Sequence, residues 1–205
     1  MGVISNGTTL LDAGAIDSGI ATGAMTLIKT LTASNSATLS FVDGSSSVVL
    51  DDTYDNYVFK FINIHPATDG ARLVFNTSVD TGSNYNVTKT TTFFHASVGE
   101  SGSDGELAYQ AGNDLAQSTD FHQLISNVGN DNDQSGSGEI ILFDPSSTTF
   151  LKHFISISST SASSDYMLNA FTAGYSNSTS AVDAVQFKMH SGNIGSGTIK
   201  MYGIK

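Results

Sequence analysis

Alternating apolar and polar residues recur along the chain from residue 37 onward. In the segment 57–64, for example, three aromatic side chains fall on one face and Lys60 falls on the other. A period of two is typical of a β-strand with one buried face. The pattern predicts about ten or eleven strands, in the segments 38–42, 57–64, 71–77, 87–96, 106–109, 121–128, 139–144, 150–157, 166–175, 185–190 and 197–204.

Turn-forming residues separate these segments. Gly, Asp, Asn, Ser and Pro cluster at 65–70, 80–84, 129–133 and 144–147, where they favour tight turns over continued strands. No run of helical period outweighs the strand pattern after residue 37. Many short strands without helices between them predict an all-β chain, folded as an antiparallel β-sandwich of jelly-roll type.

The first 32 residues have a different character. They are rich in Gly, Ala and Thr and contain no aromatic residue. Their apolar positions have a loosely helical spacing, but Gly14, Gly19 and Gly23 would each weaken a helix by about 1 kcal/mol. An apolar segment that cannot form its own core is expected to pack on the domain, on a neighbouring copy or on a larger assembly. A plain N-terminal strand with a frayed tail is the alternative.

This contrast predicts two parts of the chain. Residues 1–36 would form an N-terminal arm for anchoring or assembly, and residues 37–205 would form the β-sandwich domain.

Composition and charge exclude several classes of function. The 205 residues include 19 Asp and Glu but only 8 Lys and Arg, so the formal net charge is −11. Nucleic-acid grooves need clustered basic residues, and the single arginine, Arg72, nearly excludes bidentate recognition of phosphate. The absence of Cys excludes disulfides, thiolate catalysis and Cys-ligated zinc. No apolar run approaches the roughly 20 residues of a membrane span, and no basic start of a signal peptide precedes Lys29.

Candidate catalytic side chains lack the sequence context that their chemistry needs. The histidines form no HxH or HExxH pair, so we expect them at surface or turn positions: His65, His95, His122, His153 and His190. Glu100, Glu106 and Glu139 are the only glutamates, and a chain without Trp is a poor candidate for a sugar-cleaving cleft. No G-x-S-x-G nucleophile elbow occurs. We therefore expect no enzymatic activity, no catalytic residue and no cofactor.

Clustered oxygen ligands offer the only hint of a metal. Asp51 and Asp52 form one pair, and Asn130, Asp131 and Asp133 form a second cluster. Calcium prefers such ligands, but the twelve-residue calcium loop with its bidentate Glu is absent. Solvated turns are the better interpretation, and we predict no metal site.

Four stretches carry a resemblance, together with the opening residues 1–9. They are Thr53-Tyr-Asp-Asn-Tyr-Val-Phe-Lys-Phe-Ile-Asn-Ile-His-Pro66, Asp144-Pro-Ser-Ser-Thr-Thr-Phe-Leu-Lys-His-Phe154, Phe171-Thr-Ala-Gly-Tyr175 and Ser191-Gly-Asn-Ile-Gly-Ser-Gly-Thr-Ile-Lys-Met-Tyr-Gly203. The chain resembles, over nearly its whole length, short virion structural or tail-fibre-like proteins of marine tailed bacteriophages, including cyanophage-like ones. The resemblance includes no catalytic motif.

The resemblance implies a non-enzymatic structural protein at the virion surface. Its partners would be other capsid or tail proteins and further copies of itself, commonly as a homotrimer. Head decoration is slightly favoured over a tail fibre, because a chain of this length lacks the long shaft of a fibre. Neither nucleic acid nor a membrane is expected as a partner.

Two other functions stay open. One is a receptor-binding carbohydrate-binding module on a tail fibre, which would recognise host surface glycans through aromatic residues near loops: Tyr85, Tyr109, Tyr166 and Tyr175. The other is a capsule depolymerase, against which the missing Trp and the poor pairing of acids both argue.

Overall fold

The strands of the computed structural model account for most of the residues that it describes, which are 3–5, 8–12, 15–16, 25–102 and 104–205. The strands are β1 (Val3–Ser5), β2 (Thr8–Asp12), β3 (Ala15–Ile16), β4 (Thr26–Ser36), β5 (Leu39–Val42), β6 (Asn56–Pro66), β7 (Ala71–Ser78), β8 (Lys89–Gly99), β9 (Gly105–Tyr109), β10 (His122–Val128), β11 (Gly136–Phe143), β12 (Lys152–Ala162), β13 (Tyr166–Ser176), β14 (Ala184–Met189) and β15 (Ile194–Ile204). One short 3-10 helix, η1 (Ala111–Asn113), is the only helical element in this part of the chain.

The predicted strands are present. Each of the eleven segments overlaps one of the strands β5 to β15, and the pairings between strands are antiparallel. The prediction of an all-β antiparallel fold is therefore confirmed. The more specific prediction, a jelly-roll sandwich, stays a prediction.

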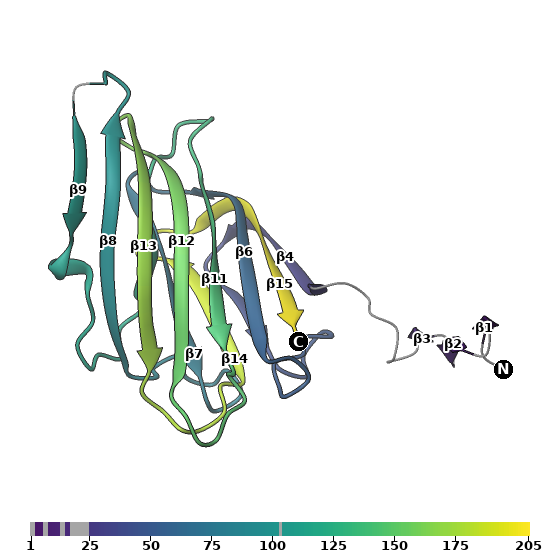
Figure 1. The fold of residues 1–205 in the computed structure, drawn as a ribbon. Coiled ribbons are helices and arrows are strands. Elements are labelled where there is room, and N and C mark those ends of the chain that lie inside the picture. The colour runs from purple at the N-terminus through teal and green to yellow at the C-terminus, as the bar shows by residue number, and fades with distance from the viewer. Residues whose placement is uncertain (1–2, 6–7, 13–14, 17–24, 103) are drawn as a thin grey trace.

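Nine strands form a nearly closed, barrel-like sheet in the order β4-β15-β6-β11-β12-β10-β7-β14-β5 (Figure 1). The two end strands of this path, β4 and β5, are joined in the chain by Ala37 and Thr38 alone. The sheet therefore returns close to its starting point, although no ladder of hydrogen bonds joins β4 to β5.

Residues 26–36, which we assigned to the arm, belong to this sheet as β4. They pair with β15 over nearly their whole length, from Thr26 opposite Gly203 to Ser36 opposite Ile194. Ala33 of β4 is buried in the core. Strands β1, β2 and β3 form a separate three-stranded sheet and pair, among the described strands, only with one another. The division of the chain into an arm and a domain stays a prediction.

Three further strands widen the sheet at β12. β13 pairs with β12 from Tyr166 to Ser176, and β8 then pairs with β13 over the same eleven residues. The short β9 finishes this edge. Figure 1 shows β9, β8, β13, β12 and β11 side by side as one broad sheet.

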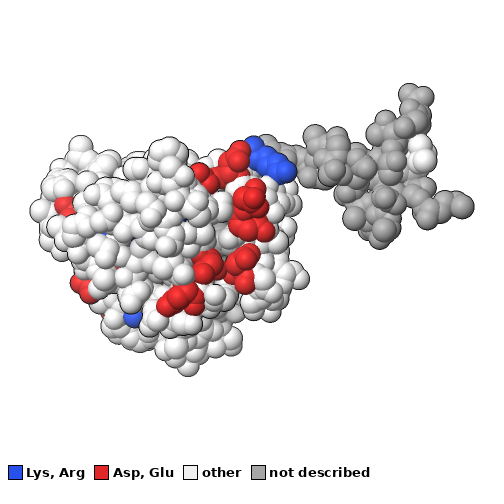
Figure 2. All heavy atoms as spheres, turned by 90° about the horizontal axis from the view of Figure 1, so that it is seen from below, with Lys and Arg blue, Asp and Glu red and all other residues white. Residues whose placement is uncertain are grey.

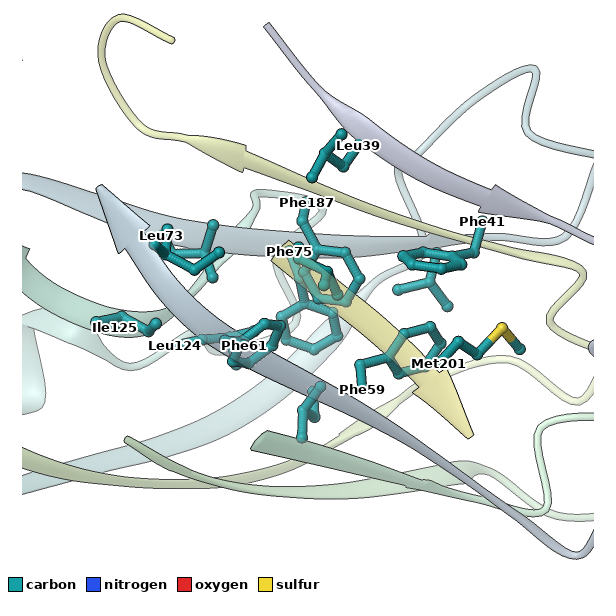
Figure 3. Close-up of a cluster of buried hydrophobic side chains, with 14 of the residues drawn as sticks. Leu39, Phe41, Phe59, Phe61, Leu73, Phe75, Leu124, Ile125, Phe187 and Met201 are labelled. Carbon is teal, nitrogen blue, oxygen red and sulfur yellow. The ribbon is translucent and has the colours of Figure 1, made fainter. Parts of the chain in front are cut away.

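Aromatic packing holds the two halves of the barrel-like sheet together. Phe187 of β14 lies at the centre, with its ring centroid 5.3 Å from that of Phe61 and 5.4 Å from that of Phe59, both on β6. Phe41 of β5 and Phe75 of β7 complete the cluster at 6.2 Å and 6.5 Å (Figure 3). Edge-to-face and tilted ring pairs at these separations add to the stabilisation from apolar burial.

Replacement of Phe187 by Ala should lower the free energy of unfolding by about 3–5 kcal/mol, because the cavity would lie among four other rings. Phe150 is 70% exposed, so Phe150→Ala should change stability by less than about 0.5 kcal/mol. Denaturant unfolding measures both variants. Equal losses in the two variants would contradict the central place of Phe187.

Candidate functional site

A row of apolar side chains crosses the outward face of the widened sheet. Ile157 on β12 stands opposite Phe171 on β13, Phe171 opposite Phe94 on β8, and Phe94 opposite Tyr109 on β9. Residues directly opposite in an antiparallel pair share one face of the sheet. The rings of Phe94 and Phe171 stack with centroids 5.0 Å apart and an interplanar angle of 7°.

We call the outward side of β12, β13, β8 and β9 the outer apolar face. Its seven most exposed large apolar residues have exposed fractions between 40% (Phe94) and 77% (Leu107): Phe94, Val98, Leu107, Tyr109, Ile155, Ile157 and Met167. Contiguous apolar patches larger than a few hundred Å² are rare on monomeric proteins and usually mark an interaction site.

The polarity of β12 is inverted relative to an ordinary half-buried strand. Ser156 and Ser158 point inward and are 2% exposed, whereas Ile155 and Ile157 point outward and are 52% and 41% exposed. The buried hydroxyls are satisfied, because Ser156 donates to the carbonyl of Glu139 and Ser158 to that of Leu124. The exposed isoleucines are therefore not required by the core of the chain.

Formal charge is confined to the margins of the outer apolar face. No outward position of its four strands, all described in the structure, is Lys, Arg, Asp or Glu. Charge begins at its border, where Glu139 of β11 stands directly opposite Ile157 and forms an ion pair with Lys60 of β6 at 2.9 Å. Glu106 of β9 is instead on the opposite face, where its carboxylate lies 3.9 Å from His95. Figure 2, a view of the molecule from below, shows a group of acidic side chains in red on another part of the surface.

A shallow hollow of about 350 Å³ opens on the same face. Phe143, His153, Ile155 and Tyr175 line it, together with Ala173 and nearby threonines and backbone. The rings of His153 and Tyr175 pack edge to face at 6.0 Å. The lining is mostly apolar, so the hollow suits an apolar side chain or the flat side of a ring.

The four tyrosines that we proposed as glycan contacts do not form one site. Tyr175 lines the hollow, and Tyr109 lies on the same face, where its hydroxyl hydrogen-bonds to Asp114. Tyr166 lies at the other end of β13, beside a polar hollow near Glu100. Tyr85 is half-buried in the connection between β7 and β8. The structure thus brings two of the four to the outer apolar face.

The other candidates stay dispersed. Among the described residues, no group of three or more His, Asp or Glu side chains could hold a metal ion. His153 is exposed on β12, and His190 is exposed just after the end of β14. Hydrogen bonds from the side chain and the amide of Thr53 lower the pKa of the Asp51 carboxyl. The described part of the chain contains no helix long and apolar enough to cross a membrane.

Sequence reasoning missed a buried polar cluster on the inward side of β8. Lys89 is fully buried and donates hydrogen bonds to Asn76 Oδ1 at 2.5 Å and to the Val87 carbonyl at 2.8 Å. Burial lowers the pKa of Lys89 to about 7. The alternation along β8 could have predicted the burial of Lys89, because Lys89 lies on the same side of the strand as Thr91 and Phe93, whose side chains point inward.

His122 of β10 lies in the same region. The expectation of a surface or turn position is wrong for this histidine, which is only 1% exposed and begins a strand. Its Nδ1 is 3.2 Å from Thr91 Oγ1, and its ring packs 6.2 Å from that of Phe154. Burial and, to a smaller extent, the charge of Lys89 lower the pKa of His122 to about 3, so the ring is neutral near pH 7. A neutral, enclosed imidazole contributes to packing here.

No known protein family, curated protein or solved structure matches this chain.

The buried His122 should make stability depend on pH. In the unfolded chain His122 takes up a proton near its ordinary pKa of 6.5, whereas in the folded chain it does so only near 3. The wild type should therefore lose stability as the pH falls from 6.5 towards 3. Denaturant unfolding across this range should show that His122→Gln removes on the order of 2–4 kcal/mol of that loss.

The matched control is His153→Gln, since His153 is exposed. This variant should keep the pH dependence of the wild type. Parallel curves for the wild type and His122→Gln would show that the enclosed imidazole does not cause the effect.

Proposed function

We propose that this chain is a non-enzymatic structural protein on the surface of a tailed-phage virion, a β-sandwich subunit anchored by its N-terminal residues. The observation that carries the proposal is the outer apolar face. Such a face is costly in water unless another protein covers it, as happens in a permanent assembly. The resemblance to virion structural and tail-fibre-like proteins supplies the kind of assembly.

Two stretches that carry the resemblance lie side by side in the fold. Residues 53–66 include β6, and residues 191–203 include most of β15, with which β6 pairs. Phe59, Phe61 and Met201 from these strands lie in the core. The resemblance therefore falls on residues that build the sheet, which supports a shared architecture more directly than a shared partner.

We propose that the barrel-like sheet is a flattened sandwich of jelly-roll type. Side chains of β5, β7 and β14 meet those of β6 and β12 across one core, as in the contacts of Phe187 with Phe61 and of Phe75 with Phe154. Two antiparallel layers that meet in this way are the arrangement of a sandwich.

The anchoring segment is proposed to be shorter than residues 1–36. β4 belongs to the main sheet, so residues that precede it are the ones available for docking to a capsid or tail protein. Homotrimers are the proposed form of the subunit, and the head shell is the proposed location. Labelled density spread over the shell supports that location, and density confined to the tail contradicts it.

Two truncations separate anchoring from folding. Removal of residues 1–24 should leave the melting temperature nearly unchanged but abolish incorporation into particles. Removal of residues 1–36 also removes β4 and the ladder that it forms with β15, and should lower the melting temperature by several degrees. Circular dichroism and immunodetection on purified particles measure the two effects. Normal incorporation of the shorter truncation would contradict an N-terminal anchor.

Recognition of host glycans is the second candidate, because Tyr175 and His153 line the hollow on the outer apolar face. Tyr175→Ala should weaken glycan binding about tenfold or more, since the flat ring that stacks on a sugar is lost. Tyr85→Ala, which lies outside the hollow, is the control. A glycan array without any wild-type signal would remove this candidate.

A further inference from the structure

We infer that the outer apolar face is covered in solution by another copy of this chain. The inference rests on the proposed function only in treating the face as an assembly surface, and it does not depend on a place in a virion. Three features of the face support a second copy over an unrelated partner: its extent, its lack of charge and its shape.

The extent of the face approaches what a stable contact between copies needs. β12, β13 and β8 are each 11 residues long and lie side by side with β9. At about 4.8 Å between strands and 3.3 Å per residue, the three long strands span roughly 15 by 35 Å, and the five-residue β9 adds a strip of roughly 5 by 17 Å. Specific interfaces bury about 800 Å² on each partner, so this face supplies most of the area that such an interface needs.

The pattern of polar and apolar residues along β12 indicates that its exposed isoleucines do not serve the core. Ser156 and Ser158 occupy the inward positions, while Ile155 and Ile157 occupy the outward ones. Two β-branched apolar residues at these outward positions reduce solubility unless they are covered. Cover by protein turns that cost into stabilisation of about 25 cal/mol for each Å² removed from water.

The distribution of charge favours a copy of the same chain. With a net charge of −11, two copies repel each other at long range. They can approach with least repulsion where the surfaces carry few formal charges, and the outward strand positions of the outer apolar face carry none. A basic partner would instead be drawn to the acidic area of Figure 2.

The shape of the face also suits an identical partner. Leu107 is 77% exposed on the edge strand β9, opposite Ala96 of β8. The apolar hollow at Tyr175 and His153 lies near the C-terminal end of β13. An exposed apolar edge and an apolar hollow on one face allow the Leu107 edge of one copy to pack against the hollow of the next.

Sedimentation of the purified full chain at several concentrations tests the inference. The wild type should sediment as an oligomer. The Ile155 side chain is 52% exposed on the outer apolar face. Ile155→Glu places a charge there and should raise the dissociation constant of the oligomer at least about tenfold. Ile62→Glu is the matched control: Ile62 is 39% exposed on β6, beyond the Lys60–Glu139 ion pair, and its variant should associate like the wild type.

A second variant, Leu107→Glu, changes the exposed edge strand β9 instead of the hollow and should weaken association to a similar degree. Circular dichroism shows whether each variant keeps the wild-type fold. The inference is overturned if the wild type is monomeric at all concentrations, if both variants associate normally, or if Ile62→Glu disrupts association as strongly as Ile155→Glu.

The proposed function can fail separately. A wild-type oligomer that is disrupted by Ile155→Glu but never found in virions would retain the inference and contradict the virion role. A monomeric chain that is nevertheless found in virions would retain the role and show that another virion protein covers the face.

Discussion

The shape of the molecule depends on how β12 divides its two edges among three partners. One edge pairs with β13 along its whole length. The other pairs with β11 from residue 154 to residue 160, and then, through the single pair of Ala162 and Val128, with β10. The barrel-like sheet changes direction where β12 changes its partner from β11 to β10. Side-chain bonds support it: Ser158 donates to the Leu124 carbonyl, and Gln134 donates to the Ala162 carbonyl.

The same strand also explains why one sheet can serve two purposes. Its inward residues meet β10 and the core, as Phe154 does through its contact with Phe75. Its outward residues continue across β13 and β8 to the stacked rings of Phe171 and Phe94. Beyond Phe154, the inward positions of β12 carry the small hydroxyl groups of Ser156, Ser158 and Thr160, whereas Ile155 and Ile157 lie on the outward side.

Much of the fold could be predicted from sequence because strand alternation is local. Each of the strands β5 to β15 was visible in a run of a few residues. β4 was not, because most of its side chains are half-buried or exposed and only Ala33 is buried, so its pattern is weak. The order of strands was also out of reach, since β6 and β15 pair across more than a hundred residues of chain.

The candidate site was less predictable than the fold for a related reason. The four tyrosines were chosen for their nearness to loops, but the pairing of strands decides which of them share a face. The buried Lys89 was overlooked because lysine normally lies in water. The inverted strand at Ile155 and Ile157 could have been noticed only after its inward neighbours were known.

Exposure of the outer apolar face also affects the order of folding and association. If another copy covers the face, as we infer, each newly folded chain exposes its isoleucine, leucine and aromatic side chains to water until that copy binds. During that interval, repulsion between the excess carboxylates on the rest of the surface opposes nonspecific aggregation. Salt screens this electrostatic repulsion but does not weaken the hydrophobic attraction of the outer apolar face. The ionic strength would therefore decide between specific association and precipitation.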